Sequence, residues 1–268
     1  MSQAATSFIR ITHIGGPTVL IEIGQMRILT DPTFDPAGTR YVAGPKELIK
    51  TTNPALQASS LGTVDVVLLS HDHHADNLDH AGRAYLLNAR HVLTTPAGAN
   101  RLASAVPGVL GVQTWERVDL EGVDGFRLSV TAMPARHGPE AIKASVGEVT
   151  GWMLEWDGQP RGALYISGDT VLFEELEEIA RRYNVGTALL HFGAAQVDVY
   201  GPVYLTFTGA QGAAFAGMLG DATIVPIHYE GWAHFSEGRA EIEQAFEAAG
   251  LEEHLRFLPL GTPTPLVL

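Results

Sequence analysis

Residues 64–77 read VDVVLLSHDHHADN. The first six form an almost continuous apolar run, which is typical of a strand buried on both faces of a sheet. Three histidines and two aspartates follow within the next seven residues. Such a cluster has no use in packing, whereas imidazole and carboxylate are ligands that Zn, Mn and Fe accept. A lone histidine here would be better interpreted as structural, but the cluster indicates a metal site.

Composition limits the remaining possibilities. The chain has 268 residues, of which 46% are hydrophobic and 18% charged, and these proportions predict a soluble globular protein with one domain over residues 1–268. No apolar run reaches the ~18 residues of a membrane-spanning helix. The start, MSQAATSFIRITHIGG, lacks the basic and apolar regions of a secretion signal. We therefore expect a cytoplasmic protein without a membrane partner.

Charge and cysteine content narrow the chemistry further. The net charge is −13, from 17 basic and 30 acidic residues, which argues against a nucleic acid polymer as partner. It does not exclude an anionic substrate, because a bound divalent metal can invert the local field. The absence of cysteine excludes disulfides, thiol nucleophiles and thiolate metal sites. Any metal must be held by nitrogen and oxygen, which the 11 histidines make feasible.

Hydrophobic periodicity predicts alternating strands and helices. Strands are expected at residues 8–14, 18–23, 26–30, 64–69, 91–94, 126–133, 151–156, 163–167, 187–190 and 222–227. Helices are expected after Thr95, across residues 172–183, after Thr208 with Gln211 completing a capping box, and over residues 236–249. Residues 35–57 are expected to be an irregular surface loop that contributes to a binding site. Together these elements predict a layered α/β protein.

Three more predicted strands are followed by histidine or aspartate. The segments MPARHG (133–138), ISGDT (166–170) and VPIHY (225–229) supply His137, Asp169 and His228. Because loops that leave strand ends bind ligands in sheet proteins, we expect these side chains to lie near residues 71–76. Such a set around one or two metals can lower the pKa of bound water to about 7.

The ordered set of motifs resembles the metallo-β-lactamase superfamily, in its branch of metal-dependent hydrolases similar to ascorbate-6-phosphate lactonase. Residues 11–16 (ITHIGG), 19–22 (VLIE) and 31–34 (DPTF) resemble the first strands and acidic loop of that branch, and residues 70–79 resemble its HxHxDH loop. The resemblance covers roughly residues 8–241. It implies a four-layer αββα sandwich.

The resemblance also implies the roles of the site residues. One metal would be held by two histidines of the first loop and His137, and a second by Asp76, Asp169 and His228, with Asp169 able to bridge. A bound water or hydroxide would be the nucleophile, and the metals would polarise the substrate oxygen. Asp76 would orient or deprotonate the water, and His228 or a nearby group would assist the leaving group.

Two positions leave alternatives open. The partner of His71 is either His73 or His74, and His74 is favoured because the chain is expected to turn after the strand rather than stay extended. Asn77 stands where the family has histidine, and an amide oxygen is a poorer zinc ligand than imidazole. The number of divalent transition metal ions, zinc or manganese, is therefore one or two.

Three functions are compatible with these features. The first is hydrolysis of an ester, lactone or amide bond in a small-molecule substrate. The second is cleavage of a small nucleotide or lipid phosphodiester, and the third is a non-catalytic scaffold with a degenerate metal site. The sequence leaves open whether the protein forms homo-oligomers.

Histidines outside the motifs receive separate interpretations. His191 either faces the site or is a buried structural residue, while His13 and Asp31 are expected to orient the ligands. His234 could contact substrate, but a solvent-facing loop position is the favoured interpretation.

Overall fold

The computed structural model describes residues 8–43, 46–122 and 125–267. Its strands are β1 (Phe8–Gly15), β2 (Thr18–Ile23), β3 (Met26–Thr30), β4 (Arg40–Ala43), β5 (Lys46–Ile49), β6 (Val64–Leu68), β7 (Ala89–Thr94), β8 (Val109–Gly111), β9 (Arg117–Glu121), β10 (Arg127–Met133), β11 (Gly151–Glu155), β12 (Ala163–Ile166), β13 (Val185–His191), β14 (Thr223–Ile227) and β15 (Thr264–Val267). The α-helices are α1 (Ala58–Leu61), α2 (His80–Tyr85), α3 (Pro96–Leu102), α4 (Lys143–Val146), α5 (Leu176–Arg182), α6 (Gly209–Met218) and α7 (Arg239–Ala249). Short 3₁₀ turns are η1 (Leu86–Asn88), η2 (Glu140–Ile142), η3 (Asp198–Tyr200) and η4 (Glu252–His254).

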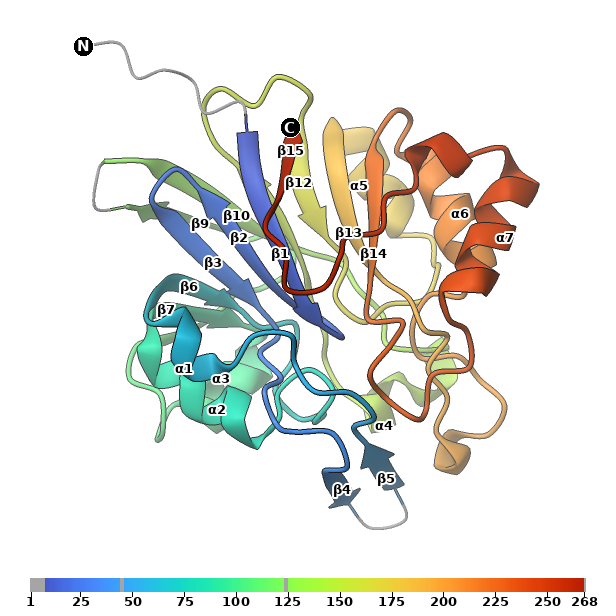
Figure 1. The fold of residues 1–268 in the computed structure, drawn as a ribbon, viewed down its shortest axis with the longest axis horizontal. Coiled ribbons are helices and arrows are strands. Elements are labelled where there is room, and N and C mark those ends of the chain that lie inside the picture. Colours follow the sequence, from blue (N-terminus) through green and yellow to red (C-terminus); the bar gives the residue numbers. More distant parts are fainter. Residues whose placement is uncertain (1–7, 44–45, 123–124, 268) are drawn as a thin grey trace.

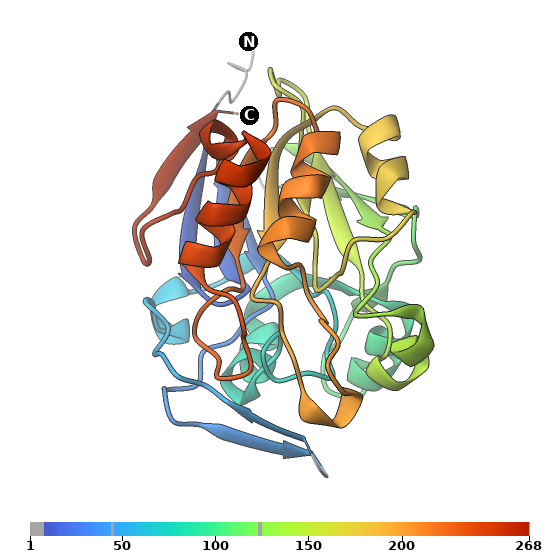
Figure 2. The same cartoon turned by 90° about the vertical axis from the view of Figure 1, so that its right-hand side faces the viewer.

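The strands form two large sheets and a separate hairpin. One sheet has the order β15-β1-β2-β3-β6-β7-β8, the other has the order β14-β13-β12-β11-β10-β9, and β4 pairs only with β5. Strands β3, β6, β7 and β8 run parallel, as do β12, β13 and β14. The hairpin projects from the same end of the molecule in both ribbon views (Figures 1 and 2).

Three apolar clusters show how the layers are held together. The largest lies between the sheets and joins residues such as Ile21 and Val66 from one to Trp152 and Leu164 from the other. A second covers the outer face of the β9–β14 sheet with α5, α6 and α7. A third covers the outer face of the other sheet with α1, α2 and α3. This arrangement confirms the αββα sandwich (Figure 1).

Most local predictions are confirmed. All ten predicted strands are present with ends within two residues of those expected. Thr95 caps α3 with its side chain, and Gly250 ends α7 in the left-handed conformation. Residues 1–7 lie outside the described part, so the structure does not test the prediction about a secretion signal.

Four local predictions are wrong. Helix α5 begins at Leu176 instead of at Leu172, because residues 172–175 are not helical. Residues 35–57 contain the β4–β5 hairpin instead of an irregular loop throughout. Thr208 caps α6, but Gln211 Oε1 accepts a hydrogen bond from Leu172 N and so does not complete a capping box. Helix α7 begins at Arg239, after its N-cap Gly238, instead of at Ser236.

None of the helices in the described ranges is both long and apolar enough to span a bilayer.

Candidate metal centre

The candidate site lies where several strands end at one edge of the two sheets. The loop 69–79 follows β6, and residues 134–138 follow β10. Asp169 and His228 follow the parallel strands β12 and β14. Because β10 and β12 are both antiparallel to β11, the ends of β10, β12 and β14 lie at the same edge of their sheet. The topology thus brings four segments together that are far apart in the chain.

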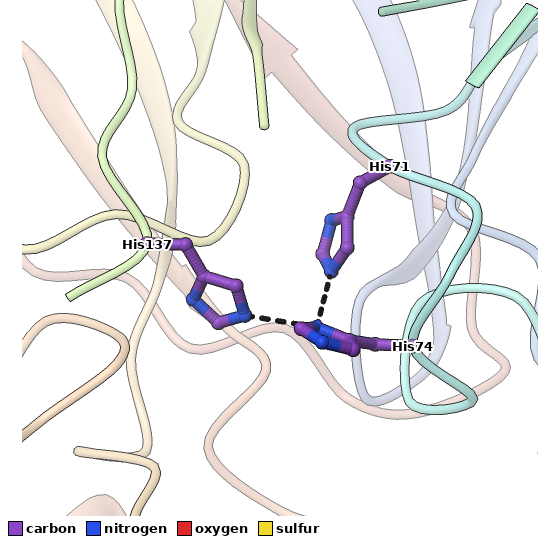
Figure 3. A group of neighbouring side chains, drawn as sticks. All are labelled: His71, His74 and His137. Atoms are coloured by element: carbon purple, nitrogen blue, oxygen red, sulfur yellow. Dashed lines mark hydrogen bonds between the residues drawn. The ribbon is translucent and has the colours of Figure 1, made fainter. Parts of the chain in front are cut away.

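Three histidines form the first group of side chains that could hold a metal ion. His74 Nδ1 lies 3.1 Å from His71 Nε2 and 3.1 Å from His137 Nε2 (Figure 3). Two nitrogens bound to one tetrahedral zinc at 2.0–2.1 Å are separated by about 3.3 Å. The three ring nitrogens therefore have the spacing of a zinc site.

Hydrogen bonds at Nδ1 of two of these rings leave the Nε2 lone pairs facing the other nitrogens of the group. His137 Nδ1 donates a hydrogen bond to the carbonyl oxygen of Leu205 at 2.7 Å, so its Nε2 carries the lone pair. His71 Nδ1 is held 2.9 Å from Ser70 Oγ, which leaves Nε2 for the group. Burial lowers the pKa of His137 and takes that of His71 well below its usual value, with the neighbouring histidines adding to the effect on His71. Neutral imidazole is the form that binds metal.

Asp76, Asp169 and His228 form the second group, and all three are buried. His228 Nε2 lies 3.6 Å from Asp76 Oδ2, and His228 Nδ1 lies 3.7 Å from Asp169 Oδ1. The other oxygen, Asp169 Oδ2, lies 3.8 Å from His137 Nε2 in the first group. One carboxylate oxygen of Asp169 therefore faces the first group and the other faces His228 of its own group.

The chemistry of the second group fits a divalent cation. Four of its buried polar atoms have no hydrogen-bond partner in the described part of the chain: Asp76 Oδ1, Asp169 Oδ2, His228 Nδ1 and His228 Nε2. Buried polar atoms without partners are costly, so such a cluster calls for an explanation such as a bound ion. Burial opposes protonation of His228, but Asp169 and Asp76 outweigh it and raise its pKa to about 9. A dication bound here would replace this positive charge.

The two first-loop alternatives are placed differently. His74 belongs to the first group, whereas His73 does not. His73 Nε2 donates to the carbonyl oxygen of Val146 at 2.7 Å, and its Nδ1 faces the pair formed by Asp72 and Arg101. The loop turns after β6, so adjacent imidazoles point in different directions. His73 is thus the one residue of the predicted ligand set that the structure leaves outside both groups.

Asn77 adjoins the second group. Its Nδ2 donates to Asp169 Oδ1 at 3.2 Å and lies 3.3 Å from Ser70 Oγ. The group of three donors is therefore complete without a ligand from position 77, and the amide orients one of its carboxylates.

The prediction for His234 is wrong. This side chain is only 8% exposed, and its Nε2 lies 3.0 Å from Asp76 Oδ2. The contact joins residues 158 positions apart in the chain. The sequence carried a weak signal, since His234 stands six residues after His228 in a segment of aromatic residues, but nothing in it indicated the direction of the ring.

Other buried polar residues lie next to the site without belonging to either group. Asp31 Oδ1 accepts from Ser70 N at 2.7 Å, which fixes the start of the loop, and Asp31 Oδ2 lies 3.3 Å from His191 Nε2. Burial raises the pKa of Asp31 to about 7 and lowers that of His191 to about 3. His191 is therefore buried and bonded to side chains, while His13 Nε2 bonds to Gly16 O. Asp31 has the supporting position that was expected.

The backbone is constrained where two ligands are presented. His228 has a φ of +57°, a region that non-glycine residues rarely adopt. Gly168, directly before Asp169, has a φ of +60°, and a Cβ there would lie 2.4 Å from the carbonyl oxygen of Thr150. Only glycine fits the turn that presents Asp169.

Comparison with known sequences identifies a matching family and related proteins. The family described as "Beta-lactamase superfamily domain" matches residues 26–229. A UPF0173 metal-dependent hydrolase of Pyrococcus abyssi is 25% identical over 238 residues, covering 88% of this chain and 91% of the relative. Another from Methanosphaerula palustris is 28% identical over 260 residues, covering 94% and 97%.

Comparison with solved structures concerns the fold. The crystal structure of isothiocyanate hydrolase from Delia radicum gut bacteria superposes with a TM-score of 0.80 at 21% identity, covering 97% of this chain and 100% of that chain. The agreement extends over both sheets and their covering helices, which supports the four-layer architecture.

Proposed function

The chain belongs to the family of the beta-lactamase superfamily domain, and from this premise we propose that it is a metal-dependent hydrolase of small molecules that cleaves an ester, lactone or amide bond. The observation that carries the proposal is the pair of donor groups: three histidine nitrogens, and beside them Asp76, Asp169 and His228. The names of the relatives from Pyrococcus abyssi and Methanosphaerula palustris agree with it.

The residues present suit two divalent ions, with the first group holding one and the second group the other. When bound, such ions supply a water that is activated near neutral pH and polarise the substrate oxygen. Zinc fits the nitrogen-rich first group, and the oxygen-rich second group also accepts manganese. The likeness to ascorbate-6-phosphate lactonase remains a prediction from the motifs, and it is the reason that lactones stay among the candidate substrates.

Different side chains act on the attacking water and on the leaving group. Asp76 Oδ2 is engaged by His234, whereas Asp76 Oδ1 has no hydrogen-bond partner in the described residues. We assign Asp76 to orienting the attacking water. A cavity opens onto the two donor groups. His234 lines this cavity, whereas His228 is fully buried and does not. His234 is therefore better placed than His228 to assist the leaving group.

The experiment is metal removal and reloading, with His137→Ala beside the matched control His80→Ala. His80 has a side chain that is 78% exposed, lies on α2 and belongs to neither donor group. We expect the control to bind metal and hydrolyse esters or lactones like the unmodified protein. His137→Ala should lose metal and turnover together, because its Nε2 belongs to the first group and lies beside Asp169.

Each result decides between the hypotheses. Less than one metal ion per chain in the reloaded protein would favour the scaffold. Bound metal with turnover of bis-nitrophenyl phosphate alone would favour the phosphodiesterase. Retention of metal and turnover by His137→Ala would remove this residue from the site.

A further inference from the structure

A small cavity opens directly onto the candidate metal centre. Its volume is about 130 Å³, which is below the roughly 300–1,000 Å³ of pockets for drug-sized ligands. Four polar residues of the site line it: His74, Asp76, His137 and His234. A molecule in this cavity would therefore meet both donor groups.

The rest of the wall is apolar. The β4–β5 hairpin contributes Tyr41, Val42 and Leu48. The segment that follows β13 contributes Ala195 and Val197, and Leu205 lies on the same side. Val42 is 71% exposed, so this part of the wall is accessible from solvent.

The polar tips of the remaining lining side chains are already engaged. Tyr41 Oη donates to Asp35 Oδ2 at 2.7 Å, and Tyr200 Oη donates to the carbonyl oxygen of Ser145 at 3.0 Å. His73 Nε2 donates to the carbonyl oxygen of Val146. These hydrogen-bonding atoms are therefore already occupied by the protein itself.

Three described cations near the cavity are each paired with a carboxylate. Among the described residues that line it there is no lysine or arginine. Arg40 makes two hydrogen bonds to Glu47 across the hairpin, and the buried Lys50 ammonium lies 3.0 Å from Asp79. Arg101, on α3, pairs with Asp72. A charged group on the substrate body would lose its hydration without gaining an opposite charge.

A second cavity on the other side of His137 is the alternative place for an anionic substrate. It has a volume of about 500 Å³ and is lined by Arg136, Lys143 and Glu148. Both cations lie within 4 Å of Glu140, and Glu148 adds a further negative charge. His137 is the only member of the two donor groups that lines this cavity among the described residues. An occupant there would not reach Asp76 or His74.

We propose that the substrate is a small neutral molecule with an apolar body, which lies between the β4–β5 hairpin and residues 195–205 with its hydrolysable group over the two donor groups. This inference rests on the proposed hydrolase function and defines its substrate class. It favours acyl esters or lactones with short alkyl or aryl substituents over phosphorylated or carboxylated compounds.

Binding without turnover provides the first test. Alkyl hydroxamic acids combine a metal-binding head and an apolar tail in the same molecule. Calorimetric titration of the metal-loaded protein with acetyl to octanoyl hydroxamates therefore measures how the affinity depends on the contact between the tail and the cavity wall. Each buried methylene should tighten binding by about fourfold until the cavity is filled. A hydroxamate with a terminal carboxylate should bind at least tenfold more weakly than its methyl counterpart of equal length.

Matched variants test whether the preference for an apolar tail arises at this wall. Val197→Arg adds a cation to the wall, whereas Val199→Arg adds one two residues away, at a side chain that is 46% exposed and outside the lining. Val197→Arg should reverse the preference between the methyl and carboxylate tails, and Val199→Arg should leave it unchanged. Val42→Thr, which keeps the side-chain shape at an exposed position, should reduce the gain per methylene and serves if Val197→Arg fails to fold.

The outcomes separate this proposal from the proposed function. A hydroxamate series with the expected chain-length dependence, but no hydrolysis of esters, lactones or amides, would refute the function and leave the cavity assignment standing. Affinity that does not depend on chain length, a preference for the carboxylate tail, or no hydroxamate binding would overturn the cavity assignment. A parallel turnover assay on phosphorylated lactones checks the class, because faster turnover than of the neutral analogues would also refute it.

Discussion

Replacing His74 or His73 with alanine distinguishes two adjacent imidazoles that the sequence could not separate. His74 Nδ1 lies 3.1 Å from a ring nitrogen of His71 and of His137, while His73 Nε2 bonds to a backbone carbonyl. Four-ligand zinc sites bind with roughly 10–16 kcal/mol, or about 3 kcal/mol per ligand. Since about 1.4 kcal/mol is a factor of ten, His74→Ala should weaken zinc binding at the first group by roughly a hundredfold.

His73→Ala is the matched control. It removes one hydrogen bond, which should lower the free energy of unfolding by about 1 kcal/mol, and it leaves the three nitrogens of the first group in place. Zinc affinity is measured by competition with a chromophoric chelator at pH 7.5, and stability by urea unfolding of the metal-free proteins. If His73→Ala lost zinc affinity as strongly as His74→Ala did, the assignment of the first group would be refuted.

Two further predictions concern the second group and follow from its charge and its backbone. The raised pKa of His228, about 9 against an ordinary value near 6.5, means that the metal-free protein gains stability from this group below pH 6.5 and loses it as the pH rises through 9. Urea unfolding at pH 7.5 and pH 9.5 should show a loss of roughly 2 kcal/mol without metal and a smaller loss with saturating zinc, because the ion replaces the proton; equal losses would contradict this. Gly168→Ala should cost more than Gly250→Ala, since both positions have a positive φ but only Gly168 has a carbonyl oxygen 2.4 Å from the added Cβ. The left-handed conformation costs a residue with a side chain roughly 1–2 kcal/mol, and only Gly168→Ala should also reduce the metal content, measured by elemental analysis; equal effects of the two substitutions would show that the turn at Asp169 is not constrained by this contact.

Local pattern was sufficient for the strands and for the chain order of the site residues. The apolar runs at residues 64–69 and 222–227 predict buried strands because the alternation and burial of side chains repeat over a few residues. The histidines and aspartates after those strands are visible in the same way. The β4–β5 hairpin was missed because the glycines and prolines of residues 35–57 indicate loops, and its two strands are too short to show a clear alternation.

The sequence by itself determined which residues could bind a metal and which strands carry them, since both depend on residue type and on short-range periodicity. Only the tertiary structure decided between His73 and His74, because the direction of each ring depends on the turn after β6 and on contacts with Val146 and His137. The same holds for His234, which reaches Asp76 across 158 positions. It holds also for the apolar cavity, whose walls come from the hairpin and from residues near 200. Long-range packing sets these directions, and no local pattern encodes them.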